Sequence, residues 1–373
     1  MNKALNKIEV EGFKSIGLMS LELHSLNVLI GANGAGKSNL LGAFKLLNEI
    51  SRGNLQVYVA TCGGADALLR FGRKKTAEIQ IELSVCYHQY ECVLAPTADD
   101  RLIFASELVS FRKEAPLTES WSLGSGHSES GLIPLRREPQ RKSGKPSSQY
   151  PSETKQYVLQ YLRGFAVYHF QDSSYSAGMK YTVDLDDNQL LRGDGANLAA
   201  FLYRLREKNP GDYSNIVQAV RLVFPFFDDF SLEPSRLNPD KIRLEWREQG
   251  SDAYFNASAL SDGTLRFICL ATLLLQPDLP STILLDEPEL GLHPYAINVL
   301  AELLRGAATK TQVIASTQSV GLVNQFEPED VIVVEREDQQ SVFRHLDRAD
   351  MESWLDDYGL GDLWEKNIIG GRP

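Results

Sequence analysis

Residues 31–38 read Gly-Ala-Asn-Gly-Ala-Gly-Lys-Ser, a phosphate-loop motif with the full Gly-x-x-x-x-Gly-Lys-Ser spacing. The apolar run Leu26–Ile30 before it predicts a buried strand, and the spacing of Leu40, Phe44 and Leu47 after it predicts an amphipathic helix. Glycines let such a loop fold tightly around phosphate oxygens, and the positive N-terminus of the next helix points at the same anion. We therefore expect a bound nucleoside triphosphate, because a chance match rarely stands between a strand and a helix.

The residue types within the loop suggest a division of work. Lys37 is expected to reach the β- and γ-phosphates of ATP, and Ser38 is expected to hold Mg²⁺ through its hydroxyl. The other residues expected to line the nucleotide are Gly31, Asn33, Gly34, Gly36 and Asn39.

A second motif lies far downstream, where the apolar run Ile283–Leu285 is followed by Asp286 and Glu287. A buried parallel strand with two acids at its carboxyl end places both carboxylates where such sheets bind ligands. Asp286 is expected to bind Mg²⁺, directly or through water, and Glu287 to act as the general base for the attacking water. Two solvated acids at a strand end are the alternative, which the upstream phosphate loop makes less attractive.

Between these motifs, Leu260–Thr264 reads Leu-Ser-Asp-Gly-Thr and precedes an apolar helical stretch, Leu265–Gln276. In this order the chain resembles the ABC-type ATPases, whose signature loop reads Leu-Ser-Gly-Gly-Gln. The resemblance implies that Ser261 and Gly263 hold the γ-phosphate bound by a second subunit, so that two chains form a homodimer on binding ATP. The alternative is that Ser261 is only the N-cap of the helix.

Within that class the chain resembles the RecF/SMC/OLD branch. The matching pieces are the Asn-containing phosphate loop, the opening segment Ile8–Ser15 and the segment Glu287–Pro294, which reads Glu-Pro-Glu-Leu-Gly-Leu-His-Pro. The tail from Val331 is similar to that of compact bacterial AAA-family ATPases without a nuclease domain. We see no heptad tract long enough for a coiled-coil arm and expect no built-in nuclease.

The chain departs from the family pattern at several positions, one of which bears on the rate of hydrolysis. Asp262 and Thr264 replace signature residues, and His293 stands where transporter motors have an Asp. Gln318 stands where ABC proteins usually carry a switch His; its amide can donate a hydrogen bond but cannot carry a proton. Lys37, Glu287 and Gln318 are the expected catalytic residues. We expect slow hydrolysis because Gln318 cannot carry a proton. Gln56 and Gln80 both remain candidates for the glutamine that completes the Mg²⁺ site.

The pattern along the chain predicts an α/β fold: an ABC-type ATPase head with a mixed or parallel central sheet flanked by helices and an N-terminal antiparallel β lobe. We expect one head over residues 1–373. Its parts are an N-terminal lobe with the phosphate loop (1–95), a middle insertion with a helical segment and an exposed loop near 124–151 (96–255), and a C-terminal lobe with the signature and the acidic strand (256–373).

The composition of the chain indicates which partners and which cellular compartment to expect. The formal charge of −11 argues against a surface coated for nucleic acid, although the basic runs 70–75 and 136–145 allow a local contact; solvated loops are the simpler interpretation of both runs. Four cysteines without a Cys-x-x-Cys pair fit a reducing compartment. No apolar tract is long enough to span a bilayer, so we expect a cytoplasmic protein with no membrane partner.

These observations predict an ATP hydrolase that acts as an ATP-gated dimerising switch. The branch it resembles suggests DNA repair or anti-phage defence, with control of DNA binding or of a separate effector such as a nuclease or toxin. The alternative is the motor subunit of a membrane transporter. The loop form with Asn33 and Asn39 and the sequence around His293 argue against that alternative.

Overall fold

The computed structural model describes residues 5–114, 117–133, 150–170, 177–251 and 253–372. The chain divides into two compact units, which are described separately below. The first unit comprises residues 1–166, 332–346 and 369–373, and the second comprises residues 167–331 and 347–368.

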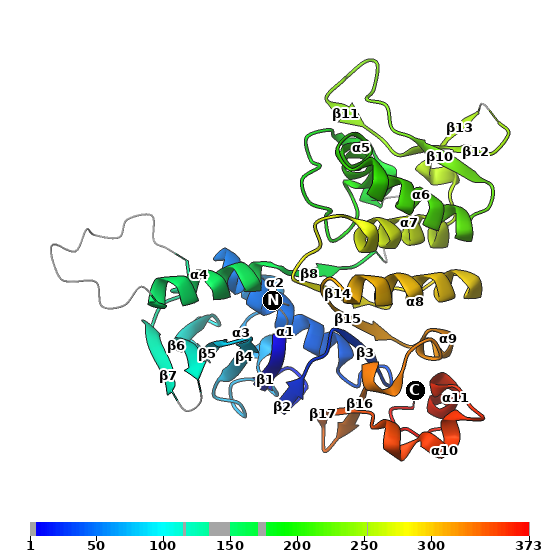
Figure 1. The fold of residues 1–373 in the computed structure, drawn as a ribbon. Helices are drawn as coiled ribbons and strands as arrows, with labels where there is room; N and C mark the ends of the chain where they lie inside the picture. The colour runs from blue at the N-terminus through cyan, green and yellow to red at the C-terminus, as the bar shows by residue number, and fades with distance from the viewer. Residues whose placement is uncertain (1–4, 115–116, 134–149, 171–176, 252, 373) are drawn as a thin grey trace. The chain divides into compact units, whose positions relative to one another are not determined.

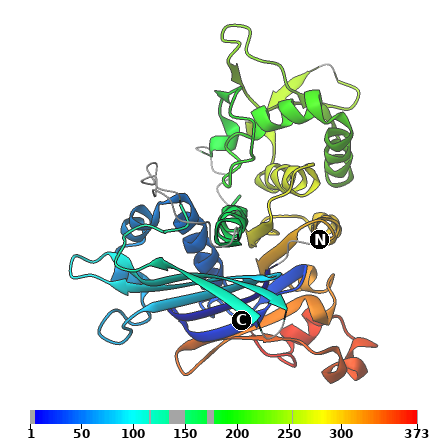
Figure 2. The same cartoon turned by 60° about the vertical axis from the view of Figure 1, so that its left-hand side comes forward.

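Six strands of the first unit form an antiparallel sheet in the order β2-β1-β4-β5-β6-β7, visible in Figure 2. Burial alternates along these strands, as the period-two pattern of the sequence predicts, so one face packs inward. The strands are β1 (Leu5–Phe13), β2 (Ile16–Glu22), β4 (Ile79–Val85), β5 (His88–Pro96), β6 (Leu102–Glu114) and β7 (Leu117–Gly124).

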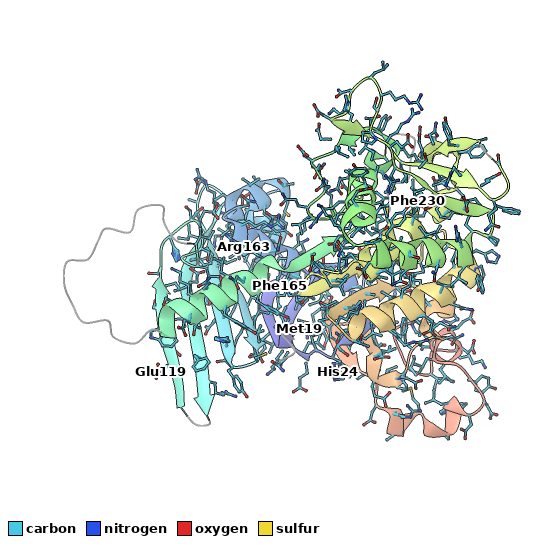
Figure 3. The ribbon with its side chains drawn as sticks, turned by 45° about the horizontal axis from the view of Figure 1, so that its top comes forward. Met19, His24, Glu119, Arg163, Phe165 and Phe230 are labelled. Atoms are coloured by element: carbon cyan, nitrogen blue, oxygen red, sulfur yellow. The ribbon has the colours of Figure 1, made fainter. Side chains whose placement is uncertain are left out.

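Helices of the first unit pack against this sheet and against each other. They are α1 (Lys37–Arg52), α2 (Leu55–Thr61), α3 (Ala65–Leu68) and α4 (Tyr150–Arg163). Phe44 of α1 meets the edge of Phe165 at 5.1 Å between ring centroids, and the Asn48 amide donates to the carbonyl of Leu162 at 3.0 Å. Figure 3 labels Arg163 and Phe165 at the end of α4, where the chain continues into β8 (Phe165–Tyr168). These contacts anchor the helix that follows the phosphate loop.

A second set of strands in the first unit leads into the phosphate loop and lies beside it. Strand β3 (Leu26–Ile30) is buried at all of its residues and neighbours β16 (Val331–Glu337). Strand β17 (Gln340–His345) pairs with β16 in antiparallel fashion. Because β3 leads directly into Gly31, the position of these strands determines where the loop begins.

The second unit contains the acidic strand. Strands β14 (Thr282–Asp286) and β15 (Gln312–Thr317) pair in parallel. Helices α7 (Asp262–Leu275) and α8 (Pro294–Ala308) pack against each other and run side by side in Figure 1. Helix α7 is buried around most of its circumference, which explains its nearly uninterrupted apolar sequence.

The other elements of the second unit are shorter or more peripheral. Phe230, labelled in Figure 3, is buried in β10 and packs its ring against Tyr213 and Phe227. The remaining elements are α5 (Leu198–Lys208), α6 (Pro210–Val223), α9 (Val320–Val323), α10 (Glu352–Leu355), α11 (Leu360–Glu365), β9 (Val183–Asp184), β10 (Phe227–Ser231), β11 (Lys241–Ile242), β12 (Glu245–Glu248), β13 (Tyr254–Asn256) and the 3-10 turns η1 (Gly178–Lys180), η2 (Ala257–Ala259), η3 (Pro328–Asp330) and η4 (Arg348–Asp350).

Most predicted elements are present, with shifted ends. Helix α6 begins at Pro210, because proline is well suited to the first position of a helix. Most of the predicted exposed loop and of the basic run 136–145 lies outside the described residues. None of the helices in the described part of the chain combines the length and apolar character of a membrane span.

Glu107 is a fully buried carboxylate on β6, the second strand from one edge of the first unit's sheet. It accepts hydrogen bonds from the Tyr90 hydroxyl at 2.8 Å, the Gly131 amide at 2.8 Å and the Ser130 hydroxyl, and it contacts the His127 ring nitrogen at 2.9 Å. The carboxylate therefore fastens the segment after β7 to the sheet.

Replacing Glu107 by Ala should lower the free energy of unfolding by about 2–4 kcal/mol, because several buried donors lose their acceptor. Ser110→Ala on the same strand is the matched control, since its hydroxyl bond to Ser120 is exposed and should be worth under about 0.5 kcal/mol. Urea unfolding followed by tryptophan fluorescence measures both. Equal midpoints for the two variants would contradict this account.

Candidate functional site

The phosphate loop closes because two of its glycines leave no room for a side chain. A Cβ on Gly31 would lie 2.2 Å from the carbonyl oxygen of Val334, and a Cβ on Gly36 would lie 2.0 Å from the Ser341 hydroxyl. Both glycines also have positive φ, +153° and +123°. The backbone N–H groups of the loop and of the first turn of α1 are thereby held in a tight cradle, the form that fits phosphate oxygens.

Lys37 and Ser38 form the first turn of α1. The Lys37 ammonium, on a side chain only 5% exposed, donates to the carbonyls of Gly31 at 2.5 Å and Ala32 at 3.1 Å. Its charge therefore lies over the loop itself. Ser38 is exposed, as are Asn33 and Gly34 at the loop tip.

A hydroxyl network supports the loop from outside, and the sequence did not single it out. The Ser341 hydroxyl donates to the carbonyl of Ala35 at 2.5 Å and lies 2.6 Å from the Ser15 hydroxyl. The Asn39 amide donates to Ser15 at 2.6 Å. Asn39 thus has a supporting contact, and its predicted role as a nucleotide ligand stays a prediction. Ser15 belongs to the family-like opening segment, whereas Ser341 has no recognisable motif.

Gly36→Ala should weaken ATP binding at least about 10-fold, roughly 1.4 kcal/mol, because the new Cβ displaces the Ser341 hydroxyl and strains a positive φ. Gly42→Ala, inside α1, is the matched control: its nearest new neighbour would be 3.6 Å away, so affinity should be unchanged. Titration with a fluorescent ATP analogue distinguishes the two. Equal affinity of Gly36→Ala and the unmodified chain would show that the cradle is not the binding determinant.

In the second unit, the acidic strand ends at a hydrogen-bonded corner. The Ser316 hydroxyl donates to Asp286, and the amide of Glu287 donates to the carbonyl of Ser316 at 2.9 Å. Glu287 has φ +47°, a left-handed conformation that is uncommon for non-glycine residues. The Gln318 side-chain amide donates to the Glu287 carboxylate. The structure therefore brings together Glu287 and Gln318, two of the three predicted catalytic residues.

Two charged residues beside this corner were not anticipated. Glu289 is 7% exposed; burial raises its pKa, hydrogen bonds from Thr317 and backbone amides act in the opposite direction, and the charge of Glu287 adds to the rise. Arg266 of α7 lines a small pocket together with Asp286 and Glu287, and its Nε donates to the carbonyl of Phe170 at 2.9 Å. Burial lowers the pKa of this guanidinium. Arg266 stands in no recognisable motif, whereas Glu289 lies in the family-like segment Glu287–Pro294, where the sequence alone assigns it no role.

The predicted signature loop is the start of α7. Ser261 is the N-cap, its hydroxyl accepting from the Thr264 amide at 3.1 Å, and it is exposed. A Cβ on Gly263 would lie 2.3 Å from the carbonyl oxygen of Gly291, so the signature loop packs directly on the loop that follows the acidic strand. The Ser261 hydroxyl thus acts as an N-cap, as the alternative interpretation expected. Because Ser261 is exposed, the N-terminus of α7 is also accessible to an anion.

The remaining candidates have other partners. His293 caps α8, its Nδ1 accepting from the Tyr295 amide at 3.3 Å. The Gln56 amide donates to two carbonyls between 2.7 and 2.8 Å, and the Gln80 amide donates across the sheet to Glu91 at 3.4 Å. In the basic run 70–75, Arg73 is paired with Asp66 and Asp100, which weakens that run as a nucleic-acid contact.

Comparison with known proteins gives two family matches. Residues 4–163 match a family described as "AAA ATPase domain", and residues 144–324 match one described as "AAA domain, putative AbiEii toxin, Type IV TA system". No curated protein matches the chain.

Among solved structures, the chain is similar to an SMC head bound to the C-terminal winged-helix domain of ScpA, with 15% identity, a TM-score of 0.55 and coverage of 92% of this chain and 98% of that one. It is also similar to an SMC head with an extended coiled coil bound to the C-terminal domain of ScpA from Pyrococcus furiosus, with 14% identity, a TM-score of 0.52 and coverage of 95% and 98%.

The fold is therefore that of an ABC-type ATPase head, as predicted. The similarity of residues 4–163 and 144–324 to AAA ATPase families, together with this fold, supports a compact RecF/SMC-like AAA ATPase.

Proposed function

We propose that the whole chain acts as one ATPase head that hydrolyses ATP slowly and uses ATP to close a homodimer. The observation that carries this proposal is the pairing of Gln318 with Glu287 at the end of the acidic strand, in a chain that also builds a phosphate cradle. A strand-end carboxylate held by a neutral donor is suited to water activation. The family matches support the ATPase class to which this chemistry belongs.

In this proposal the loop binds the nucleotide. Lys37 leaves the carbonyls of Gly31 and Ala32 for the β- and γ-phosphates, which offer its ammonium stronger, charged acceptors. Ser38 and Asp286 supply the hydroxyl and carboxylate oxygens that suit Mg²⁺. When bound, Mg²⁺ neutralises charge that develops on the phosphate oxygens.

Glu287 accepts the proton of the attacking water, and Gln318 orients that carboxylate and the water through its amide. Because an amide cannot take up a proton, Gln318 adds orientation but no second acid or base. This is the physical reason for proposing slow turnover.

The second subunit completes the site through its signature loop. Ser261 is exposed at the N-terminus of α7 and Gly263 lies in the first turn, and a helix N-terminus favours an anion. A γ-phosphate bound by the partner subunit would then stabilise the closed dimer and not the separated chains.

What the closed dimer controls is proposed from similarity. The toxin–antitoxin description of one matched family supports control of a separate toxin. The resemblance to the RecF/SMC/OLD branch is the basis for proposing a cytoplasmic role in anti-phage defence or repair, with control of a nuclease or of DNA as the other forms of that role. A transporter motor remains the second candidate by class, but no feature described above favours it.

Light scattering of Glu287→Gln with Mg-ATP tests the proposal. The variant should bind ATP and shift from monomer to dimer, because hydrolysis no longer reopens the closed dimer. Without nucleotide the same variant should stay a monomer. Glu287→Gln combined with Lys37→Ala is the matched control and should show no ATP-dependent shift.

A Glu287→Gln chain that binds ATP but keeps one mass with and without it would contradict the dimerising switch. A wild-type chain that releases no phosphate from Mg-ATP would contradict the hydrolase.

A further inference from the structure

Glu289 is a buried acid that the proposed reaction does not use. It follows Glu287 by two residues in the loop between β14 and α8 and is 7% exposed. Its Oε1 accepts the Thr317 hydroxyl at 2.5 Å and the Gln318 backbone amide at 3.3 Å. Its Oε2 is buried without a hydrogen-bond partner among the described residues. Burying a carboxyl at this cost calls for a compensating role.

Both donors to Glu289 come from the corner that follows β15. The Thr317 hydroxyl also accepts from the Ser319 amide at 3.0 Å, so the corner is a small closed network around the Glu289 oxygen. Gln318 is held at two points by the loop after β14: its backbone by Glu289 and its side chain by Glu287. The bond to Glu289 fixes the backbone of Gln318, and the bond to Glu287 fixes its side chain. Together the two bonds fix the direction of the glutamine side chain.

We propose that Glu289 is a positioning residue for hydrolysis: it fixes the Thr317–Gln318 corner so that the Gln318 amide is aimed at Glu287. This inference rests on the proposed ATPase function. Glu289 itself makes no contact with the reacting groups in this account and acts only through Gln318.

The proposal requires a hydrogen-bond acceptor at position 289 and does not require a negative charge there. A Gln at position 289 keeps an accepting oxygen in the same place, so Glu289→Gln should preserve the corner. Glu289→Leu fills a similar volume but leaves the Thr317 hydroxyl and the Gln318 amide without their acceptor. Small displacements of groups around a reacting water are costly, about 100-fold for an ångström.

Steady-state hydrolysis of Mg-ATP by the full-length chain tests the inference. Glu289→Leu should lower kcat about 10- to 100-fold with KM changed less than about threefold, because the residues proposed to bind the nucleotide lie elsewhere. Glu289→Gln should stay within about threefold of wild type. In a Gln318→Ala background, Glu289→Leu should cause almost no further loss, since the residue through which it acts is gone.

Full additivity of Glu289→Leu and Gln318→Ala would overturn the inference, as would equal damage by Glu289→Gln and Glu289→Leu. If Glu289→Leu does not fold, Thr317→Val takes its place, with a smaller kcat loss that must likewise disappear in the Gln318→Ala background. A wild-type chain without hydrolysis overturns the proposed function and this inference with it, whereas an active wild type and an equally active Glu289→Leu overturn the role of Glu289 alone.

Discussion

The close approach of Val334 and Ser341 to the phosphate loop is the constraint on which the shape of that loop depends. A carbonyl and a hydroxyl occupy the space where any side chain at Gly31 or Gly36 would lie. The loop is therefore pressed into its cradle by strands from the other end of the chain, β16 and β17. A motif of eight residues is shaped by contacts more than 300 positions away, as the Ser15–Ser341 pair illustrates.

The acidic strand of the second unit is also fixed by contacts with a neighbouring strand, made in this case by side chains. Asp286 and Glu287 end a strand, and each is tied to the corner after the neighbouring strand, Asp286 through Ser316 and Glu287 through Gln318. Parallel pairing of β14 and β15 makes this possible, because it brings both carboxyl ends to one edge. In the proposed reaction, Gln318 orients the Glu287 carboxylate but cannot itself carry a proton, as a histidine could.

The sequence predicted the motifs well because their chemistry is local. Phosphate-loop glycines, a strand ending in two acids and a Ser-initiated apolar helix can each be recognised within about ten residues. Ser341 and Arg266 stand in no motif and could not be predicted. Glu289 lies in the family-like segment Glu287–Pro294, but its contacts with Thr317 and Gln318 appear only when the two loops pack. Asn39 shows the same limit: its motif suggests a nucleotide ligand, while its amide contacts Ser15.

The central claim is that Gly31–Ser38 of one chain and the signature loop of another form one working site. Mixing two inactive variants, Lys37→Ala and Ser261→Arg, tests it most directly. In a mixed dimer, the intact phosphate loop of one chain faces the intact Ser261 of the other, so ATP hydrolysis should appear on mixing although each variant alone is silent. Hydrolysis by Ser261→Arg alone at the wild-type rate, or a mixture that stays silent although mixed dimers form, would contradict the account.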